Sequence, residues 1–357
     1  MNKGAKLSLL PFELKKIETK AVLRKEAQAR QALAELRGFA PVIPNQNILI
    51  SAIVLSEAKE SSAIENIITT QDELYKNLAI NPGKFDPSTK EVLNYREALY
   101  KGFEIVKKKA LIRVSDIIKI QEIIVENNAG IRRLPGTSLV NDATGKVVYT
   151  PPQDFREISD LLGNFCEYFN SNDNEENSLW KMALLHYQFE SIHPFYDGNG
   201  RTGRILNILY LILKNYLSSP ILYLSSYIIK TKTNYYTLLS ETRKKKNYEP
   251  WILYILDGIE KTAIQTLEKI RAIKGLMEST IESAKIKCPK IYSKELVEAI
   301  FENPYSKIDF LVKKLSVNRK TASKYLKELE REKFLSHLQA GKEILYINKN
   351  LMEILKI

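Results

Sequence analysis

Twelve consecutive residues, His193 to Arg204, carry the side chains best suited to chemistry in this sequence. They read His-Pro-Phe-Tyr-Asp-Gly-Asn-Gly-Arg-Thr-Gly-Arg. The imidazole of His193 can accept a proton near neutral pH, as a general base must. Because Pro194 disfavours a helical backbone at the residue before it, we expect the preceding apolar helix to end there. The imidazole would then stand at a helix-to-loop junction.

The two glycines that flank Asn199 predict an anion site. Glycine lets successive backbone N–H groups converge on one point, and the segment leads into the apolar helix 205–213, whose amino end carries a partial positive charge. Arg201 and Arg204 are three residues apart, so they would share a helix face beside this nest. Asp197 could hold Mg²⁺, since a Mg²⁺ ion that carries phosphates needs only one or two carboxylates. These residues together suit transfer of a phosphate-containing group from a nucleotide.

The same segment formally matches the dinucleotide fingerprint G-x-G-x-x-G from Gly198 to Gly203. That fingerprint must follow a buried strand and precede an acidic residue by about 20 positions. Here the preceding residues are polar and end a helix, and the region around 218–220 holds no acid. No Walker A or kinase signature competes for the nucleotide. We therefore reject a dinucleotide site.

Residues His193 to Arg204 match the motif HPFx(D/E)GNGRxxR at every fixed position, and on this motif the chain resembles the Fic family. The resemblance extends to Gly130 to Arg132, to the hairpin ending Tyr149-Thr-Pro-Pro152, and to Tyr235-Tyr236 ahead of Trp251. It implies a protein adenylyltransferase: the motif histidine deprotonates a Tyr, Thr or Ser hydroxyl, which attacks the α-phosphate of ATP. Relatives that transfer a bare phosphate have lysine where this chain has Gly200, so AMP transfer is favoured.

The resemblance also assigns roles to single residues. His193 would be the catalytic base and Asp197 the ligand of Mg²⁺, the expected cofactor. The hairpin near 139–149 would be a flap that aligns a target peptide by strand addition. The expected partners are ATP and a protein with a modifiable hydroxyl, the chain itself included. The implied ATP-binding residues are Gly198, Asn199, Gly200, Arg201, Thr202, Gly203, Arg204 and, in the adenine pocket, Tyr235.

A second family feature precedes the core. Ser61-Ser-Ala-Ile-Glu65-Asn66 matches the pattern (S/T)xxxE(G/N), which implies the class with an amino-terminal inhibitory helix at about 61–66. In that class the glutamate pairs with the second motif arginine, here Glu65 with Arg204, and blocks placement of the γ-phosphate. The alternative is an ordinary capping box, Ser62-x-x-Glu65, in which Glu65 only satisfies backbone donors. Some family members also remove AMP with this glutamate, and that activity stays open.

Apolar residues recur at three- and four-residue spacing through most of the chain, which predicts a mainly α fold. We expect a Fic-type helical core with a small β-hairpin flap and a carboxy-terminal winged helix-turn-helix domain, whose recognition helix opens at 318–321. The expected domains are 1–94 (amino-terminal helices), 95–260 (catalytic core), 261–287 (linker helix) and 288–357 (winged helix). Helices are predicted at 17–36, 46–60, 62–78, 88–108, 115–127, 155–170, 177–191, 201–216 and 233–272, the last broken near Pro250, and hairpin strands at 138–140 and 146–149 around a turn.

Composition limits the other classes of function. The 357 residues are 44% hydrophobic and 27% charged, which excludes disordered and collagen-like chains. Two cysteines are too few for a disulfide framework or a zinc site, and the most apolar run, 205–213, is far shorter than the roughly 20 residues of a membrane helix. We expect a cytoplasmic protein without membrane contact. The charge of +12 leaves DNA open as a partner of 288–357, and with it a DNA-binding regulator whose Fic core is idle or senses nucleotide. A homodimer also stays open.

Other candidate residues have simpler interpretations. His186 lies seven residues before His193 and could orient it, but we interpret it as a core histidine. His337 is interpreted as a surface residue of the wing. The basic runs 107–109 and 243–246 are interpreted as solvated faces.

Overall fold

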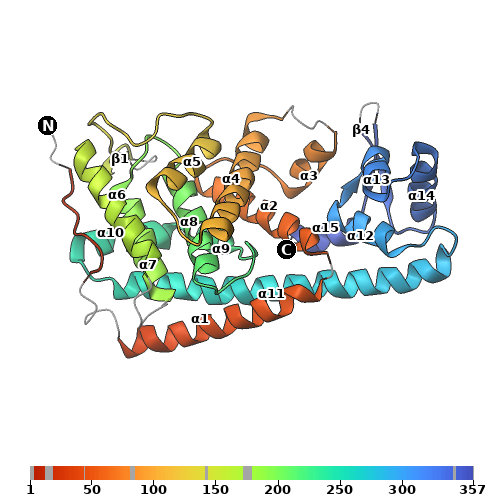
Figure 1. Ribbon diagram of the computed structural model, residues 1–357, viewed down its shortest axis with the longest axis horizontal. Helices are drawn as coiled ribbons and strands as arrows, with labels where there is room; N and C mark the ends of the chain where they lie inside the picture. The colour runs from red at the N-terminus through yellow and green to blue at the C-terminus, as the bar shows by residue number, and fades with distance from the viewer. Residues whose placement is uncertain are drawn as a thin grey trace.

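The computed structural model describes residues 4–12, 19–43, 45–80, 85–140, 144–171, 179–340 and 343–356, and these are mainly helical (Figure 1). Several predicted positions lie outside the described residues: the starts of the helices predicted from 17 and from 177, the hairpin turn 141–143, and Gly341. The helices are α1 Lys20–Phe39, η2 Ala40–Val42 (a short 3₁₀ helix), α2 Gln46–Ile64, α3 Gln71–Ile80, α4 Pro87–Lys109, α5 Val114–Val125, α6 Phe155–Asn170, α7 Leu179–Ile192, α8 Asn199–Leu213, α9 Leu224–Lys230, α10 Lys232–Lys245, α11 Glu249–Lys287, α12 Lys294–Glu302, α13 Ile308–Leu315, α14 Arg319–Arg331 and α15 Lys349–Lys356.

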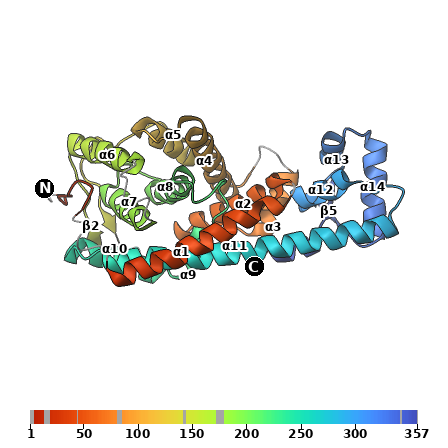
Figure 2. The same ribbon diagram turned by 60° about the horizontal axis from the view of Figure 1, so that its bottom comes forward.

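The long helix α11 joins the two ends of the molecule (Figures 1 and 2). Helix α1 packs along it, and Lys25 of α1 donates to Asp257 and Glu260 of α11 at 2.7 and 2.6 Å. Helices α4 to α10 lie toward one end of α11, and α12 to α14 lie at the other (Figure 1). Because α11 is continuous, the predicted boundary between residues 260 and 261 falls inside one helix. Among the described helices, none is both long and apolar enough to cross a membrane.

Helices α7 and α8 form the centre of the core. Every residue of α7 is buried, because large apolar side chains such as Trp180, Leu184 and Phe189 point to all sides of the helix. The indole N–H of Trp251 donates to the carbonyl oxygen of Ala183 at 2.7 Å and fastens α11 to α7. The segment that connects α7 to α8, residues 193–198, is therefore anchored at both ends by buried helices.

Two small antiparallel sheets complete the fold. Strands β1 Leu139–Val140 and β2 Val147–Tyr149 form the predicted hairpin, with Leu139 opposite Tyr149. In the carboxy-terminal part, β3 Tyr305–Ser306, β4 Ser336–Ala340 and β5 Glu343–Ile347 form a sheet in the order β3-β5-β4. Helix, strand, two helices and a hairpin in this order are a winged helix-turn-helix arrangement. The predicted fold class is confirmed.

The amino-terminal helices differ from their prediction. Helix α2 runs without a break through residues 60–62, which contain neither proline nor glycine. It ends at Ile64 with Glu65 as its C-cap, because Asn66 takes a backbone φ of +63°. The predicted helix 62–78 therefore begins only at Gln71. Ser62 lies inside α2 and Glu65 at its carboxyl end, so the capping-box alternative, which needs a helix start, is wrong.

Other boundaries were shifted or missed. Helix α8 begins at Asn199, before the predicted residue 201, because Gly198 caps it. The predicted break before Pro250 is confirmed, with Lys246 left-handed between α10 and α11. The sequence did not predict α9, α15 or β3, which are short. Tertiary contacts rather than local pattern decide such segments.

Candidate active site

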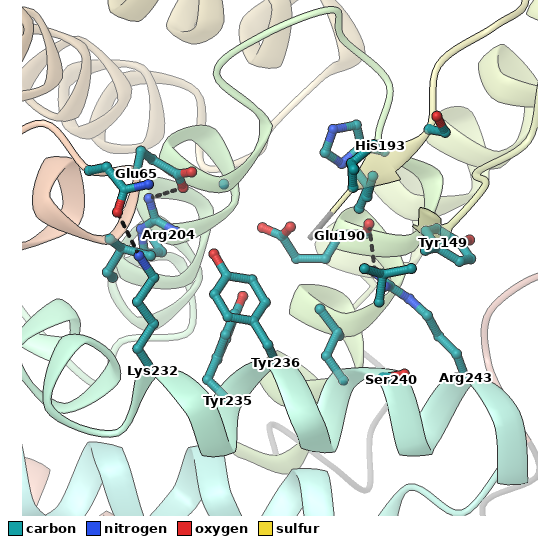
Figure 3. A pocket seen from close by; sticks show the side chains of 18 residues that line it. Glu65, Tyr149, Glu190, His193, Arg204, Lys232, Tyr235, Tyr236, Ser240 and Arg243 are labelled. Carbon is teal, nitrogen blue, oxygen red and sulfur yellow. Dashed lines mark hydrogen bonds and ion pairs between the residues drawn. The ribbon is translucent and has the colours of Figure 1, made fainter. Parts of the chain in front are cut away.

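A pocket of about 700 Å³ opens where the end of α2, the start of α8, helix α10 and the hairpin meet (Figure 3). Its lining includes a cationic part with Arg204 and Lys232, beside the first turn of α8 at Gly200. Aromatic and apolar residues of α10 and the hairpin form much of the remaining wall. Anionic groups fit the first part and a flat or apolar group fits the second.

His193 lines this pocket directly after the end of α7. Its backbone φ of +48° turns the chain, and its N–H still donates to Phe189 O at 3.0 Å. Burial is the main reason that the pKa of His193 falls to about 4, and the charges of Arg243 and Arg132 lower it further. The imidazole is therefore neutral at pH 7, which is the form that accepts a proton.

Arg132 holds the loop that carries His193. Its buried guanidinium donates from Nε to His193 O at 2.8 Å and also contacts the carbonyl oxygen of Pro152, next to the hairpin. Its own backbone N–H donates to Pro194 O at 2.9 Å. One side chain thus ties the histidine to the end of the hairpin.

The predicted nest coincides with the amino end of α8. Gly198 is its N-cap at φ +79°, and a Cβ there would lie 2.8 Å from Val125 Cγ1, so only glycine fits. Asn199 does not reach for a ligand: its Oδ1 accepts the Phe195 N–H at 2.9 Å and its Nδ2 donates to Phe195 O at 2.8 Å. Asn199 therefore closes the loop, and the N–H groups of the first turn are left for an anion.

We expect Asn199→Ala to lower the midpoint of thermal unfolding. The change leaves the buried N–H and carbonyl of Phe195 without their partner, at about 1 to 3 kcal/mol for each unsatisfied group. Circular dichroism against temperature measures the shift. Asn127→Ala is the control, since exposed Asn127 makes one bond, to the Ala129 N–H. Equal shifts in the two variants would contradict the role of Asn199.

Arg201 and Asp197 lie beside the pocket rather than in its lining. Buried Arg201 donates from Nη1 to Glu91 of α4 at 2.6 Å, and its Nη2 is 3.6 Å from Asp197 Oδ1. The Asp197 side chain is 71% exposed, and its Oδ1 accepts the Gly198 N–H at 2.5 Å. An exposed carboxylate next to a phosphate nest fits a Mg²⁺ ion, but the described residues contain no cluster of three metal-ligating side chains, so nucleotide phosphates and water would complete the shell.

Thr202 and Gly203 serve packing. The Thr202 Oγ1 is buried, and no described residue offers it a hydrogen-bond partner. A Cβ on Gly203 would lie 2.9 Å from Glu190 Oε1 and 3.1 Å from Phe189 Cδ1, so the glycine allows α8 to approach α7. Neither Thr202 nor Gly203 belongs to the residues that line the pocket.

Arg204 is held by the end of α2. Its Nη2 donates to Glu65 Oε1 at 2.7 Å (Figure 3). The same Nη2 donates to Ser61 O at 2.9 Å, and the Nε donates to Ser61 Oγ at 2.7 Å. Burial alone would raise the pKa of Glu65, but the charge and hydrogen bond of Arg204 offset it and hold the pKa below its usual range. A Cβ on Gly200 would overlap Glu65 Oε1. Glu65 therefore occupies the space directly over the nest.

Helix α2 is fixed in this position by a second glutamate, Glu57. The Glu57 carboxyl accepts the Ser225 N–H of α9 at 2.9 Å and the Tyr95 hydroxyl of α4 at 3.2 Å. Beyond the end of α2, Asn66 Oδ1 accepts from Lys232 of α10 at 3.1 Å. The three motif residues Ser61, Glu65 and Asn66 thus all contact pocket-lining cations.

Comparisons with known proteins match the chain to one family. Three family models match consecutive parts of the chain: "Fic/DOC family N-terminal" at residues 23–104, "Fic/DOC family" at 111–211, and "Protein adenylyltransferase SoFic-like, C-terminal domain" at 276–351. The chain belongs to the Fic/DOC family. The second model spans the whole segment from His193 to Arg204.

Curated Fic relatives match shorter stretches. "Protein adenylyltransferase Fic" of Nematostella vectensis is 32% identical over 130 residues, 35% of this chain and 29% of that protein. The protein of the same name from Aedes aegypti is 25% identical over 199 residues, 55% of this chain and 38% of that protein. The matches thus span less than two fifths of these relatives.

Solved Fic structures share the fold over more of the chain. A Fic family protein from Desulfovibrio desulfuricans gives a TM-score of 0.59 at 18% identity, over 92% of this chain and 96% of that one. A Fic domain containing signaling protein from Bacteroides thetaiotaomicron gives 0.55 at 20% identity, over 70% of this chain and 97% of that one. At these identities the similarity concerns the fold.

The two neighbouring tyrosines of α10, Tyr235 and Tyr236, differ in burial. Tyr235 is fully buried and its hydroxyl is 2.9 Å from His186 Nε2, while the His186 ring stacks on Trp251. Burial lowers the pKa of His186 to about 3, as for a neutral core histidine, which agrees with our interpretation. Tyr236 is 45% exposed and presents more of its ring to the pocket than Tyr235 does. Both tyrosines line the pocket, and the adenine contact expected of Tyr235 stays a prediction.

Sequence reasoning missed three charged residues of the pocket: Lys232, Arg243 and Glu190. Arg243 was grouped with a solvated basic run, but only residues 244–246 are exposed. Its guanidinium lies 3.9 Å from the Tyr149 ring centroid and donates from Nη2 to Glu190 O at 3.0 Å. A guanidinium packs against rings more readily than the lysines beside it, and that difference was a usable signal.

Glu190 lies one turn before His193 in an otherwise mostly apolar helix, which was the available signal for it. Its side chain is buried, and burial raises the pKa of its carboxyl to about 7. A raised pKa means that the folded state keeps the proton more firmly than the unfolded state. Its contribution to stability is therefore full below about pH 4.5 and is lost as pH rises through 7.

We accordingly expect the Glu190→Gln variant to gain stability relative to wild type as the pH rises from 5 to 8, because glutamine carries no charge to bury. Unfolding midpoints of wild type and variant, measured at both pH values, give the comparison. Glu104→Gln at an exposed position of α4 is the control and should show no such difference. A stability difference that does not change with pH would contradict the burial of a titrating carboxyl.

Proposed function

We propose that the chain is a protein adenylyltransferase that transfers AMP from ATP to Tyr, Thr or Ser hydroxyls of proteins, itself included. The observation that carries the proposal is one pocket that joins a neutral histidine, His193, to the amino end of α8 and to Arg204. The names of the curated relatives support the same reaction. Gly200 supports AMP transfer over phosphate transfer, since the relatives that transfer a bare phosphate have lysine at this position.

The proposed reaction begins when His193 takes the proton of the target hydroxyl. The freed oxygen forms a bond to the α-phosphorus of ATP, the bond from that phosphorus to the bridging oxygen breaks, and pyrophosphate leaves with the electron pair. The N–H groups at the start of α8 and the guanidinium of Arg204 would bind the phosphates throughout. Mg²⁺, held at Asp197 together with the phosphates, would neutralise part of their charge.

The hairpin would hold the target segment. Its Leu139, Val140, Val148 and Tyr149 line the pocket beside His193, and Val140 and Val148 are 47% and 53% exposed. A short strand with exposed apolar side chains can pair with an extended peptide through its main chain. The target hydroxyl would then stand within reach of His193.

Glu65 would inhibit the reaction in this state. Its carboxylate holds Arg204 and lies over Gly200, where phosphates would bind. A phosphate cannot pair with the same guanidinium edge unless Glu65 leaves it, and like charges repel. Release of Glu65 is therefore the proposed activating step.

Intact-protein mass spectrometry tests the proposal. The Glu65→Gly variant is incubated with ATP and Mg²⁺, and we expect the chain to gain the mass of one or more adenylyl groups. Peptide mapping then identifies the modified hydroxyls. A gain of phosphate mass alone would show kinase chemistry, and no gain in either the variant or the wild type would count against an enzyme and for the regulator alternative.

A further inference from the structure

The buried carboxyl of Glu190 has no part in the proposed reaction. It lies three residues before His193, is 8% exposed, and lines the pocket. Its Oε1 has no hydrogen-bond partner among the described residues. Figure 3 shows the carboxylate directed into the pocket, with Arg204 on one side and His193 on the other. Oε1 packs toward Gly203 of α8, and the carboxyl group as a whole lines the pocket, so a donor of a bound ligand can satisfy this carboxyl.

The phosphates of a nucleotide cannot be that ligand group. They carry acceptors and negative charge, and an ionised carboxylate repels them. The nest and Arg204 already offer the phosphates a place with the opposite charge. A nucleoside, in contrast, carries donors: the amino group of its base and the hydroxyls of its ribose.

The wall next to Glu190 suits the nucleoside half. Tyr236 and Leu239 of α10 and Val148 of the hairpin line the same pocket and offer an aromatic and apolar surface. In such an apolar pocket, a small number of polar groups fixes the orientation of a small ligand. Glu190 is such a group, and it keeps an accepting oxygen whether its carboxyl is ionised or neutral.

We propose that Glu190 is a specificity-determining residue that accepts a hydrogen bond from a donor of the nucleoside, either the amino group of the base or a ribose hydroxyl. The inference rests on the proposed binding of a nucleotide in this pocket but not on AMP transfer. It predicts that a nucleotide without the donor binds more weakly only while Glu190 is present. A site built to receive a donor strongly rejects the analogue that lacks it.

Titration calorimetry on the full chain tests this inference. Both proteins carry Glu65→Gly to free Arg204, and one of them also carries Glu190→Ala. The probes are the Mg²⁺ complexes of ATP, purine riboside triphosphate, which lacks the amino group, 2′-deoxy-ATP and 3′-deoxy-ATP. With Glu190 present we expect one analogue to bind about 10-fold more weakly than ATP, which corresponds to a hydrogen bond of about 1.4 kcal/mol. With Glu190→Ala that ratio should fall toward one, and the analogue concerned identifies the donor.

Two further variants separate recognition from packing. Glu190→Gln keeps an accepting oxygen and should retain the discrimination, whereas Glu190→Met keeps volume without an acceptor and should lose it even if Glu190→Ala folds poorly. Equal analogue-to-ATP ratios with and without Glu190 would overturn the inference. Absence of ATP binding to the parent protein would overturn it together with the proposed function, while failure of AMP transfer alone would leave it standing.

Discussion

Automodification with AMP is expected to rise about 10- to 100-fold when Glu65 is replaced by glycine. Glu65 makes a 2.7 Å charge-assisted bond to Arg204, and hydrogen bonds to charged groups contribute about 1.5 to 3 kcal/mol. About 1.4 kcal/mol corresponds to a factor of ten in rate. Loss of the competing Glu65 carboxylate should therefore raise the labelling rate by about one to two factors of ten. The initial rate of labelling from ATP with a tagged adenosine gives the measurement.

The chain offers a matched control for this change. Glu126 also stands at the carboxyl end of a helix, α5, at φ +53°, and pairs with Lys90 at 2.5 Å, away from the pocket lining. Glu126→Gly removes the same side chain from a position where glycine fits, so labelling should remain at the wild-type rate. If Glu65→Gly binds ATP normally and labels no faster than wild type, Glu65 is not an inhibitor.

The contacts that place Glu65 show how far a local pattern can predict a site. The hexapeptide around Glu65 and the twelve residues up to Arg204 were recognisable because each is continuous in sequence. Their pairing depends on α2 packing against α8 and α9, and Glu57 secures it through Ser225, 168 residues away. Local periodicity could not predict that contact, and it also placed a helix start at residue 62, where α2 continues.

Backbone chemistry was the most reliable predictor. Pro194 predicted the end of α7, and Gly198 takes the positive φ that glycine allows at the start of α8, since both rest on steric limits of single residues. The ends of helices without such residues were less well predicted, as at α2. Short elements such as α9 and α15 are stabilised by tertiary burial, which a single sequence does not display.

Side-chain partners were the least predictable feature. Arg201 and Arg204 lie on one turn of α8, and spacing suggested a shared phosphate clamp. In this structure Arg201 pairs with Glu91 of α4 and Arg204 pairs with Glu65 of α2, and spacing predicted neither partner. Glu190 and Arg243 enter the pocket only because α7 and α10, which are separate in sequence, both border it. Charge run and helix face alone could not reveal these positions.

Replacing His193 with alanine is expected to reduce the labelling rate of the Glu65→Gly protein by about 10²- to 10⁴-fold, the usual contribution of a general base. ATP should still bind, because the phosphates are proposed to contact α8 and Arg204 rather than the imidazole. The pKa of His193 near 4 adds a pH signature. A base works when deprotonated, so the rate should hold from pH 7 down to about 5 and fall below 4 as the imidazole takes a proton.

His337→Ala supplies the comparison, since this side chain is 59% exposed in the hairpin of the carboxy-terminal sheet and pairs with Glu330 there. Labelling should be unchanged in that variant, which shows that loss of a histidine as such is harmless. Calorimetry with ATP separates the two ways in which His193→Ala could fail. Lost labelling with normal ATP affinity supports the role of base, whereas an equal loss of ATP affinity would assign His193 to binding.

A labelling rate that rises steadily from pH 5 to 8 in the Glu65→Gly protein would instead point to a proton acceptor with a pKa near neutrality. Glu190, with a pKa of about 7, would then become the candidate to replace next.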